Sequence, residues 1–123
     1  MTKEWKLRVI YHRLTETVDI FRYNQKSYKG EGIESICALR YAITVCKVVK
    51  SIVDEIQNKN KQGKELVELL YLSKFILHGI NETSYYVPYR LETGDYSIVK
   101  ENFEVCIDAL DRLIKSYEEC DWQ

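Results

Sequence analysis

The chain has 123 residues and a formal net charge of -1, with 18 basic against 19 acidic side chains. This balance excludes the strong positive charge that is typical of a general nucleic-acid binder. The length suits one continuous core, so we predict a single domain over residues 1–123. No apolar run is as long as the ~18 residues of a membrane span and the N-terminus lacks a signal-peptide core, so we expect a cytoplasmic protein without membrane contact.

The composition favours helices, because only one proline and five glycines interrupt the chain. Ile, Lys and Tyr together exceed a quarter of the residues, a bias typical of AT-rich genomes, so we expect a bacterial, archaeal, phage or viral source. Four cysteines, at positions 37, 46, 106 and 120, match no zinc-ligand spacing. We therefore predict no metal and no cofactor, and we interpret the cysteines as small buried hydrophobic residues.

The first predicted helix runs from about Lys3 to Tyr23, with Thr2 as its N-cap. Its apolar residues recur at helical spacing: Leu7, Ile10, Leu14, Val18 and Phe21. An alternation of apolar and basic residues from Trp5 to Val9 also fits a strand, but the helical pattern continues for five turns. A polar loop is expected over residues 24–32.

The second predicted helix covers residues 32–60, where apolar residues repeat at steps of four and three: Ala38, Ala42, Val45, Val49, Ile52 and Ile56. Ile36, Leu39 and Ile43 lie on a different side of the same helix. This helix is therefore expected to be covered from two sides. The polar run at residues 58–63 marks its end.

The third predicted helix, residues 64–78, is apolar almost all round, which predicts a central position, and Gly79 is expected to cap it in a left-handed conformation. A connector follows over residues 81–96, extended near Tyr85–Tyr89 and with a turn at Gly94. The fourth predicted helix begins at Ser97 as N-cap and ends near Glu119. Its stripe is Val99, Phe103, Cys106, Leu110, Leu113 or Ile114, and Tyr117.

These elements predict an all-α protein: an up-down-up-down four-helix bundle with a long Tyr-rich connector between the third and fourth helices. No catalytic motif accompanies them. His12 and Glu16 stand one helical turn apart, but no nucleophile or second carboxylate is tied to them by spacing. We predict no catalytic residues, and an enzyme centred on His12 is the weakest of three functional hypotheses.

Aromatic and basic residues gather in the two connectors that an up-down bundle places at one end. The candidate partner-binding residues are Tyr23, Lys26, Tyr28, Lys29, Tyr85, Tyr86, Tyr89, Arg90 and Tyr96. Tyrosines beside basic groups suit protein interfaces and also nucleotide recognition. A third interpretation is that these tyrosines only cover the end of the core.

Surplus apolar residues on the first two helices predict self-association into a homodimer or a larger homo-oligomer. The candidate residues are Trp5, Val9, Ile20, Ile36, Leu39 and Ile43. We therefore expect a non-enzymatic protein–protein interaction module, such as a small phage- or virus-encoded inhibitor that docks onto a partner protein. The alternative is a module that binds a nucleotide or nucleic acid at the Tyr/Lys/Arg-rich end.

Overall fold

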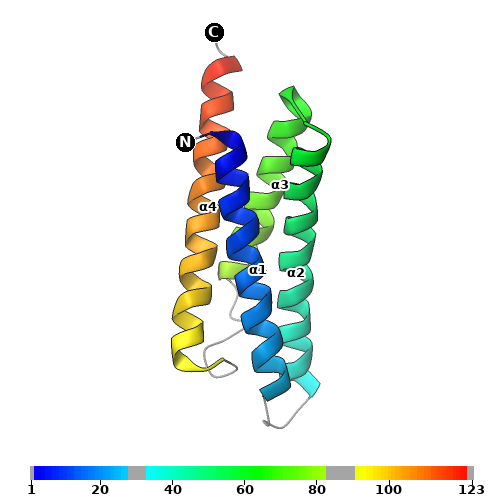
Figure 1. Cartoon of the computed structure of the whole chain (residues 1–123), viewed down its shortest axis with the longest axis vertical. Coiled ribbons are helices and arrows are strands. Elements are labelled where there is room, and N and C mark those ends of the chain that lie inside the picture. Colours follow the sequence, from blue (N-terminus) through cyan, green and yellow to red (C-terminus); the bar gives the residue numbers. More distant parts are fainter. Residues whose placement is uncertain (1, 28–32, 83–90, 122–123) are drawn as a thin grey trace.

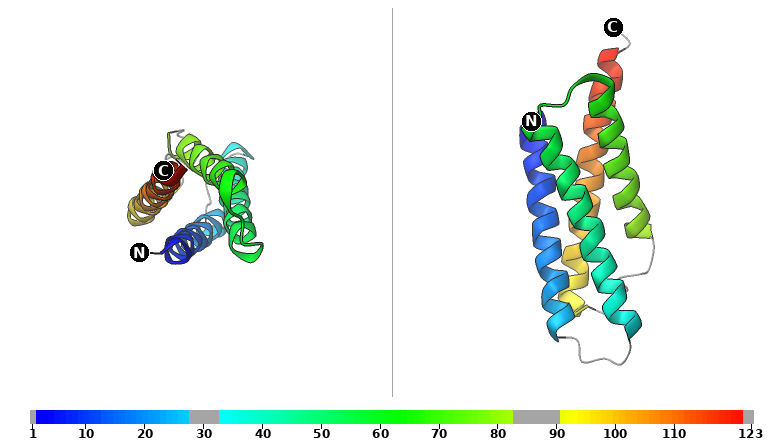
Figure 2. Two further views of the ribbon diagram at one scale, coloured as in Figure 1. Left: turned by 90° about the horizontal axis from the view of Figure 1, so that it is seen from above. Right: turned by 90° about the vertical axis from the view of Figure 1, so that its right-hand side faces the viewer.

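The computed structural model describes residues 2–27, 33–82 and 91–121, and over these residues it contains four α-helices and no strand. They are α1 (Lys3–Ser27), α2 (Ile33–Asn58), α3 (Gly63–Glu82) and α4 (Thr93–Asp121). Each helix packs chiefly against two others, in the ring order α1, α2, α3, α4 (Figures 1 and 2). The prediction of an all-α, bundle-like fold is confirmed. None of the helices in the described ranges is long and apolar enough to cross a bilayer.

Two hydrogen bonds join the ends of α1 to the ends of its neighbours α2 and α4. The side chain of Gln57, at the end of α2, donates a hydrogen bond to the carbonyl of Glu4, at the start of α1. The amide of Asn24, near the end of α1, lies 2.9 Å from the carboxylate of Asp95 at the start of α4. The last turns of α4 extend past the other helices (Figure 1).

The core consists of the apolar stripes that helical periodicity predicts. Every predicted core residue of α1 is buried, as are the α4 residues from Val99 to Ile114 that belong to its stripe. Two aromatic rings, Phe21 of α1 and Phe103 of α4, lie 6.4 Å apart between centroids. In α2 the stripe is buried at four positions, while Val45 and Ile52 are partly buried against the core. The interior is thus continuous along α1, α2 and α4.

Two helix ends are capped by local hydrogen bonds. The hydroxyl of Thr2 accepts a hydrogen bond from the backbone N–H of Trp5 at 3.1 Å, which confirms the predicted N-cap of α1. At the end of α2, Asn60 adopts a positive φ of 45°, and the N–H of Lys61 reaches the carbonyl of Ile56. With the bond from the N–H of Asn60 to Gln57, this is a Schellman cap. It ends α2 where the polar run predicted an end.

Three predicted boundaries are wrong. Helix α1 continues through Asn24 to Ser27, because the buried Asn24 amide finds partners in the carbonyl of Ile20 and in Asp95. Helix α4 begins at Thr93 rather than at Ser97, and Asp95 lies in its first turn, where a carboxylate is favourable. Gly79 does not end α3, because the helix continues to Glu82 and buries Ile80 on the way.

Candidate interaction surface

The outer side of α3 exposes large apolar side chains. Phe75 is 78% exposed, Leu72 47% and Tyr71 44%. The prediction that α3 lies at the centre of the bundle is therefore wrong. Its neighbours α2 and α4 cover two flanks, and the buried residues Leu66, Leu70, Ser73, Leu77 and Ile80 form only one stripe. The apolar residues beyond that stripe remain on the surface.

A pocket of about 270 Å³ opens on this side of α3, between Tyr71, Lys74, Phe75, His78 and Gly79. The first four residues have the spacing i, i+3, i+4 and i+7, which is the spacing of a hole that receives a knob side chain from a facing helix. Apart from its chain neighbours and its own helix backbone, no atom of the described residues lies within 4 Å of the point where a side chain on Gly79 would begin. The pocket is therefore open to a side chain from outside.

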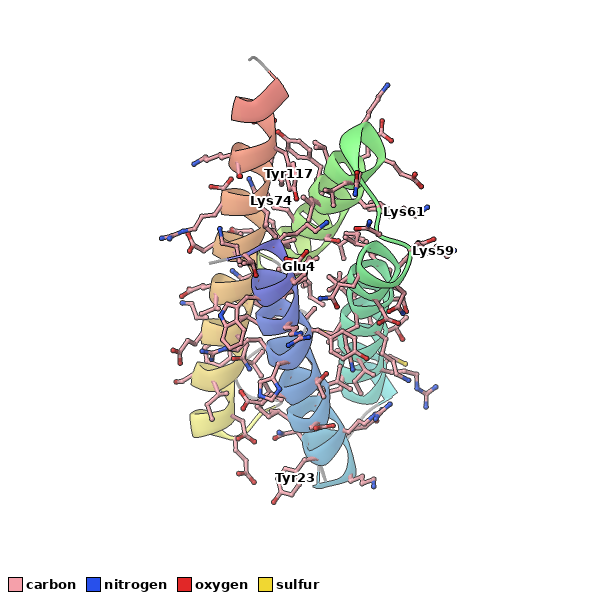
Figure 3. The ribbon with its side chains drawn as sticks, turned by 45° about the horizontal axis from the view of Figure 1, so that its top comes forward. Glu4, Tyr23, Lys59, Lys61, Lys74 and Tyr117 are labelled. Carbon is pink, nitrogen blue, oxygen red and sulfur yellow. The ribbon has the colours of Figure 1, made fainter. Side chains whose placement is uncertain are left out.

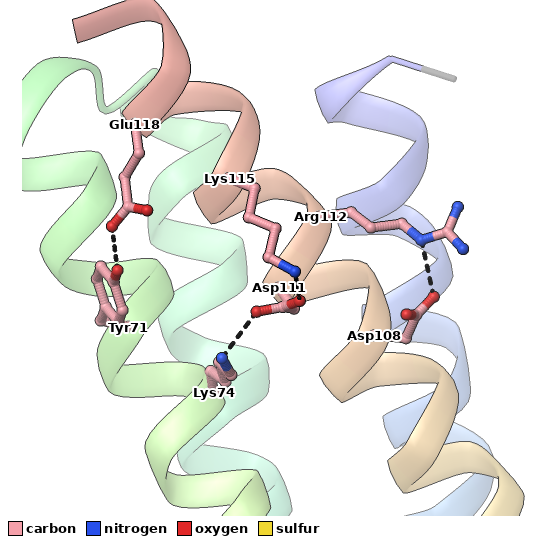
Figure 4. Close-up of polar contacts among 7 residues, drawn as sticks. All are labelled: Tyr71, Lys74, Asp108, Asp111, Arg112, Lys115 and Glu118. Atoms are coloured by element: carbon pink, nitrogen blue, oxygen red, sulfur yellow. Dashed lines mark hydrogen bonds and ion pairs between the residues drawn. The ribbon is translucent and has the colours of Figure 1, made fainter. Parts of the chain in front are cut away.

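Polar contacts to α4 hold two walls of the pocket in place (Figure 4). The ammonium of Lys74 lies 2.8 Å from the carboxylate of Asp111, which also pairs with Lys115 at 2.9 Å. The hydroxyl of Tyr71 donates a hydrogen bond to the carboxylate of Glu118. Bonds from Lys74 and Lys115 lower the pKa of Asp111, and the bond to Glu118 raises the pKa of Tyr71.

Two ion pairs of the same order, with the basic residue before the acidic one, flank the apolar residues along α3. Lys64 lies 3.9 Å from Glu68 before them, and His78 lies 3.9 Å from Glu82 after them. All four side chains are mostly exposed. We call the whole set the α3 face, and it consists of Lys64, Glu68, Tyr71, Leu72, Phe75, His78, Gly79 and Glu82.

Most of the predicted Tyr/Lys/Arg-rich end lies outside the described residues: Tyr28, Lys29, Tyr85, Tyr86, Tyr89 and Arg90. Tyr23 and Lys26 are exposed near the end of α1. Figure 3 shows Tyr23 far along the bundle from Lys59 and Lys61. Tyr96 is partly buried and packs against the core. Binding at this end stays a prediction.

The second apolar side that the sequence predicts on α2 is not on the surface. Leu39 and Ile43 are buried in the core, and Lys50 and Gln57, on the same side of α2, contact Tyr11 and Glu4 of α1. Their assignment as exposed self-association residues is wrong, and the side chain of Ile36 lies outside the described set. On α1, Ile20 also packs against the core and Val9 is partly buried. Trp5 remains exposed.

His12 and Glu16, the acid–base pair considered in the sequence, lie on α1. His12 is exposed, and its neighbour Glu16 accepts a hydrogen bond from Asn102 at 2.8 Å. No cluster of three or more metal-ligating side chains occurs within the described ranges. A polar hollow between α1 and α2 contains Lys50 above the ring of Tyr11, with the ammonium 4.8 Å from the centroid. That contact is a cation–π pair between two helices.

The sequence pattern did not predict the α3 face as a candidate site. Its signal is present, since α3 carries more apolar residues than one buried stripe can use. Helix α2 also carries apolar residues beyond its main stripe, but two of them, Leu39 and Ile43, are buried. Comparison with known proteins adds no assignment: no protein-family profile matches the chain, and neither the curated proteins nor the solved structures searched contain a significant match.

Proposed function

We propose that this protein is a non-enzymatic protein–protein interaction module that binds through the α3 face. The observation that carries the proposal is the exposure of Phe75, a residue that is 78% exposed beside an open pocket. Aromatic side chains are enriched at the cores of protein interfaces. Contiguous exposed apolar groups on a small protein mark interaction sites.

The arrangement of the pocket supports this proposal. Its walls Tyr71 and Lys74 are already held by Glu118 and Asp111 (Figure 4), so a partner need not order them. A preorganised surface loses less conformational entropy on binding. A helix that presents one bulky apolar side chain fits a hole of this spacing.

The helix-end contacts support an up-down-up-down topology as the scaffold of this face, with α1 and α3 running opposite to α2 and α4. Within this proposal, the protein works in the cytoplasm as a docking module, and where the partner is another protein its role is to modulate or inhibit that protein, in the manner of small virus-encoded inhibitors. Nucleotide or nucleic-acid binding at the Tyr/Lys/Arg-rich end is the alternative. A nucleotide thermal-shift panel on the wild-type protein distinguishes the two.

Site-specific photocrosslinking tests the proposal. Phe75 is replaced by the photoreactive benzoylphenylalanine in the cells from which the sequence comes, and the matched control carries the same group in place of Ile98. Ile98 is an apolar residue of α4 that is 41% exposed and lies outside the α3 face. We expect discrete protein adducts from position 75 and none of those adducts from position 98. Absence of adducts at position 75, or the same adducts at both positions, contradicts the proposal.

A further inference from the structure

The order of charged residues along the α3 face indicates which partner binds there. We propose that the α3 face binds the α3 face of a second copy, with the two helices antiparallel about a two-fold axis level with Ser73. This inference rests on the proposed function and names the partner for the same site.

Antiparallel pairing about position 73 places a lysine opposite a glutamate at both ends of the contact, and it places a histidine, which is charged when protonated, opposite a second glutamate. Lys64 and Glu82 are equally far from this position, on opposite sides of it, and so are Glu68 and His78. Lys64 of one copy then lies opposite the partner's Glu82, and Glu68 lies opposite the partner's His78. Each pair occurs twice because a two-fold interface repeats every contact.

The intrachain ion pairs fit the same arrangement. Lys64–Glu68 and His78–Glu82 are long and exposed contacts within one chain, each 3.9 Å. In the antiparallel dimer the two pairs adjoin and form a square of alternating charges. Parallel pairing would instead oppose Lys64 to Lys64 and Glu68 to Glu68, and like charges in contact disfavour a complex. The order of charges therefore selects the antiparallel orientation.

The apolar centre of the face matches this axis as well. Tyr71 and Phe75 lie two residues to either side of position 73, so each Tyr71 faces the partner's Phe75. Leu72 lies close to the axis and faces its own counterpart. The exposed ring of Phe75 is removed from water at the mouth of the partner's pocket, which Tyr71 helps to form. Aromatic anchors at the centre with a charged rim are the usual anatomy of a protein interface.

Sedimentation equilibrium of the full chain provides the first test. We expect wild-type protein to be a dimer at micromolar concentrations and the variant Phe75→Glu to be a monomer with unchanged helical circular dichroism. The matched control Ile98→Glu also adds a charge at an exposed apolar site and is expected to remain a dimer. A dimer that persists in Phe75→Glu, or a wild-type chain that is monomeric at several hundred micromolar, overturns the inference.

Charge reversal tests the orientation. Lys64→Glu and Glu82→Lys each oppose like charges twice in the antiparallel dimer, so each is expected to raise the dissociation constant about threefold to tenfold at low salt. The double variant Lys64→Glu/Glu82→Lys restores unlike pairs and is expected to return to the wild-type value. If the double variant dimerises no better than the single variants, the antiparallel pairing is wrong.

The two proposals fail in different ways. A monomeric wild-type chain that still gives adducts with another protein at position 75 overturns self-pairing and leaves the docking function intact. A wild-type dimer that survives Phe75→Glu, together with no adducts at position 75, overturns both. Adducts at position 75 of twice the mass of the chain, reduced in the Lys64→Glu variant and restored in Lys64→Glu/Glu82→Lys, support both.

Discussion

The guanidinium of Arg13 in α1 donates a hydrogen bond of 2.9 Å to the side-chain carbonyl of Asn102 in α4. Asn102 is fully buried. The amide nitrogen of Asn102 donates to Glu16 and to the hydroxyl of Thr17, at 2.8 and 3.1 Å. A buried amide without partners would cost stability, but here both ends are satisfied. This network lets a polar residue occupy the stripe of α4 next to Phe103 and joins α4 to α1.

Asn102→Ala is expected to lower the free energy of unfolding by about 1 to 3 kcal/mol, because the buried hydroxyl of Thr17 then loses the hydrogen bond that Asn102 donates to it. Glu104→Ala, an exposed position of the same helix, is the control and should change this free energy by less than about 0.5 kcal/mol. Urea denaturation measures both. Equal effects would show that Asn102 does not hold the two helices together.

Ser73→Ala is expected to raise the free energy of unfolding, whereas Asn102→Ala lowers it. The Ser73 hydroxyl is buried in α3 and makes no hydrogen bond to any part of the chain that the structure describes. Its removal should raise the free energy of unfolding by up to about 1 kcal/mol, since alanine is also the better helix former. A clear loss of stability in the same denaturation assay would reveal a partner for this hydroxyl.

The burial of Leu39 can be tested directly. Leu39→Ala is expected to cost about 2 to 5 kcal/mol, as a large-to-small change in the core does. Val48→Ala, at an exposed apolar position of the same helix, is expected to cost far less. If both changes are equally mild in thermal and urea unfolding, Leu39 does not face α1 as described.

Periodicity predicted the four helices and their inner stripes because an apolar residue at every third or fourth position defines one face without reference to other helices. It could not tell which surplus apolar residues are covered. Leu39 and Phe75 have the same kind of surplus signal, yet Leu39 is fully buried and Phe75 is 78% exposed. Interhelical distances and rotations decide this difference, and they depend on all four helices together.

The buried thiols predict a dependence of stability on alkaline pH. Burial raises the pKa of the Cys46 thiol, and it raises that of Cys106 from 9.0 to about 12. Because the unfolded chain loses these protons at lower pH, the stabilisation is complete below about pH 9 and declines as the pH rises toward 12. The decline is at most about 1.4 kcal/mol per pH unit for each thiol.

The variant Cys46→Ala/Cys106→Ala is the control for this effect. It retains the exposed Cys37 and every tyrosine and lysine, so the difference between its pH profile and that of the wild type isolates the buried pair. Urea denaturation from pH 8 to 11 is the measurement. Parallel profiles would mean that the two thiols ionise as readily in the fold as in the unfolded chain.

The distance between two copies of one spin label tests the antiparallel α3 pairing most directly. The label is placed at the exposed position Gln62, in a chain with Cys37→Ser and Cys120→Ser, while the buried Cys46 and Cys106 stay unreactive. Antiparallel helices centred at Ser73 place the two Gln62 backbones about 30 to 35 Å apart, given a rise of about 1.5 Å per residue and adjacent axes about 9 Å apart. A dipolar distance in that range supports the account, whereas a distance near 10 Å, or no coupling between copies, contradicts it.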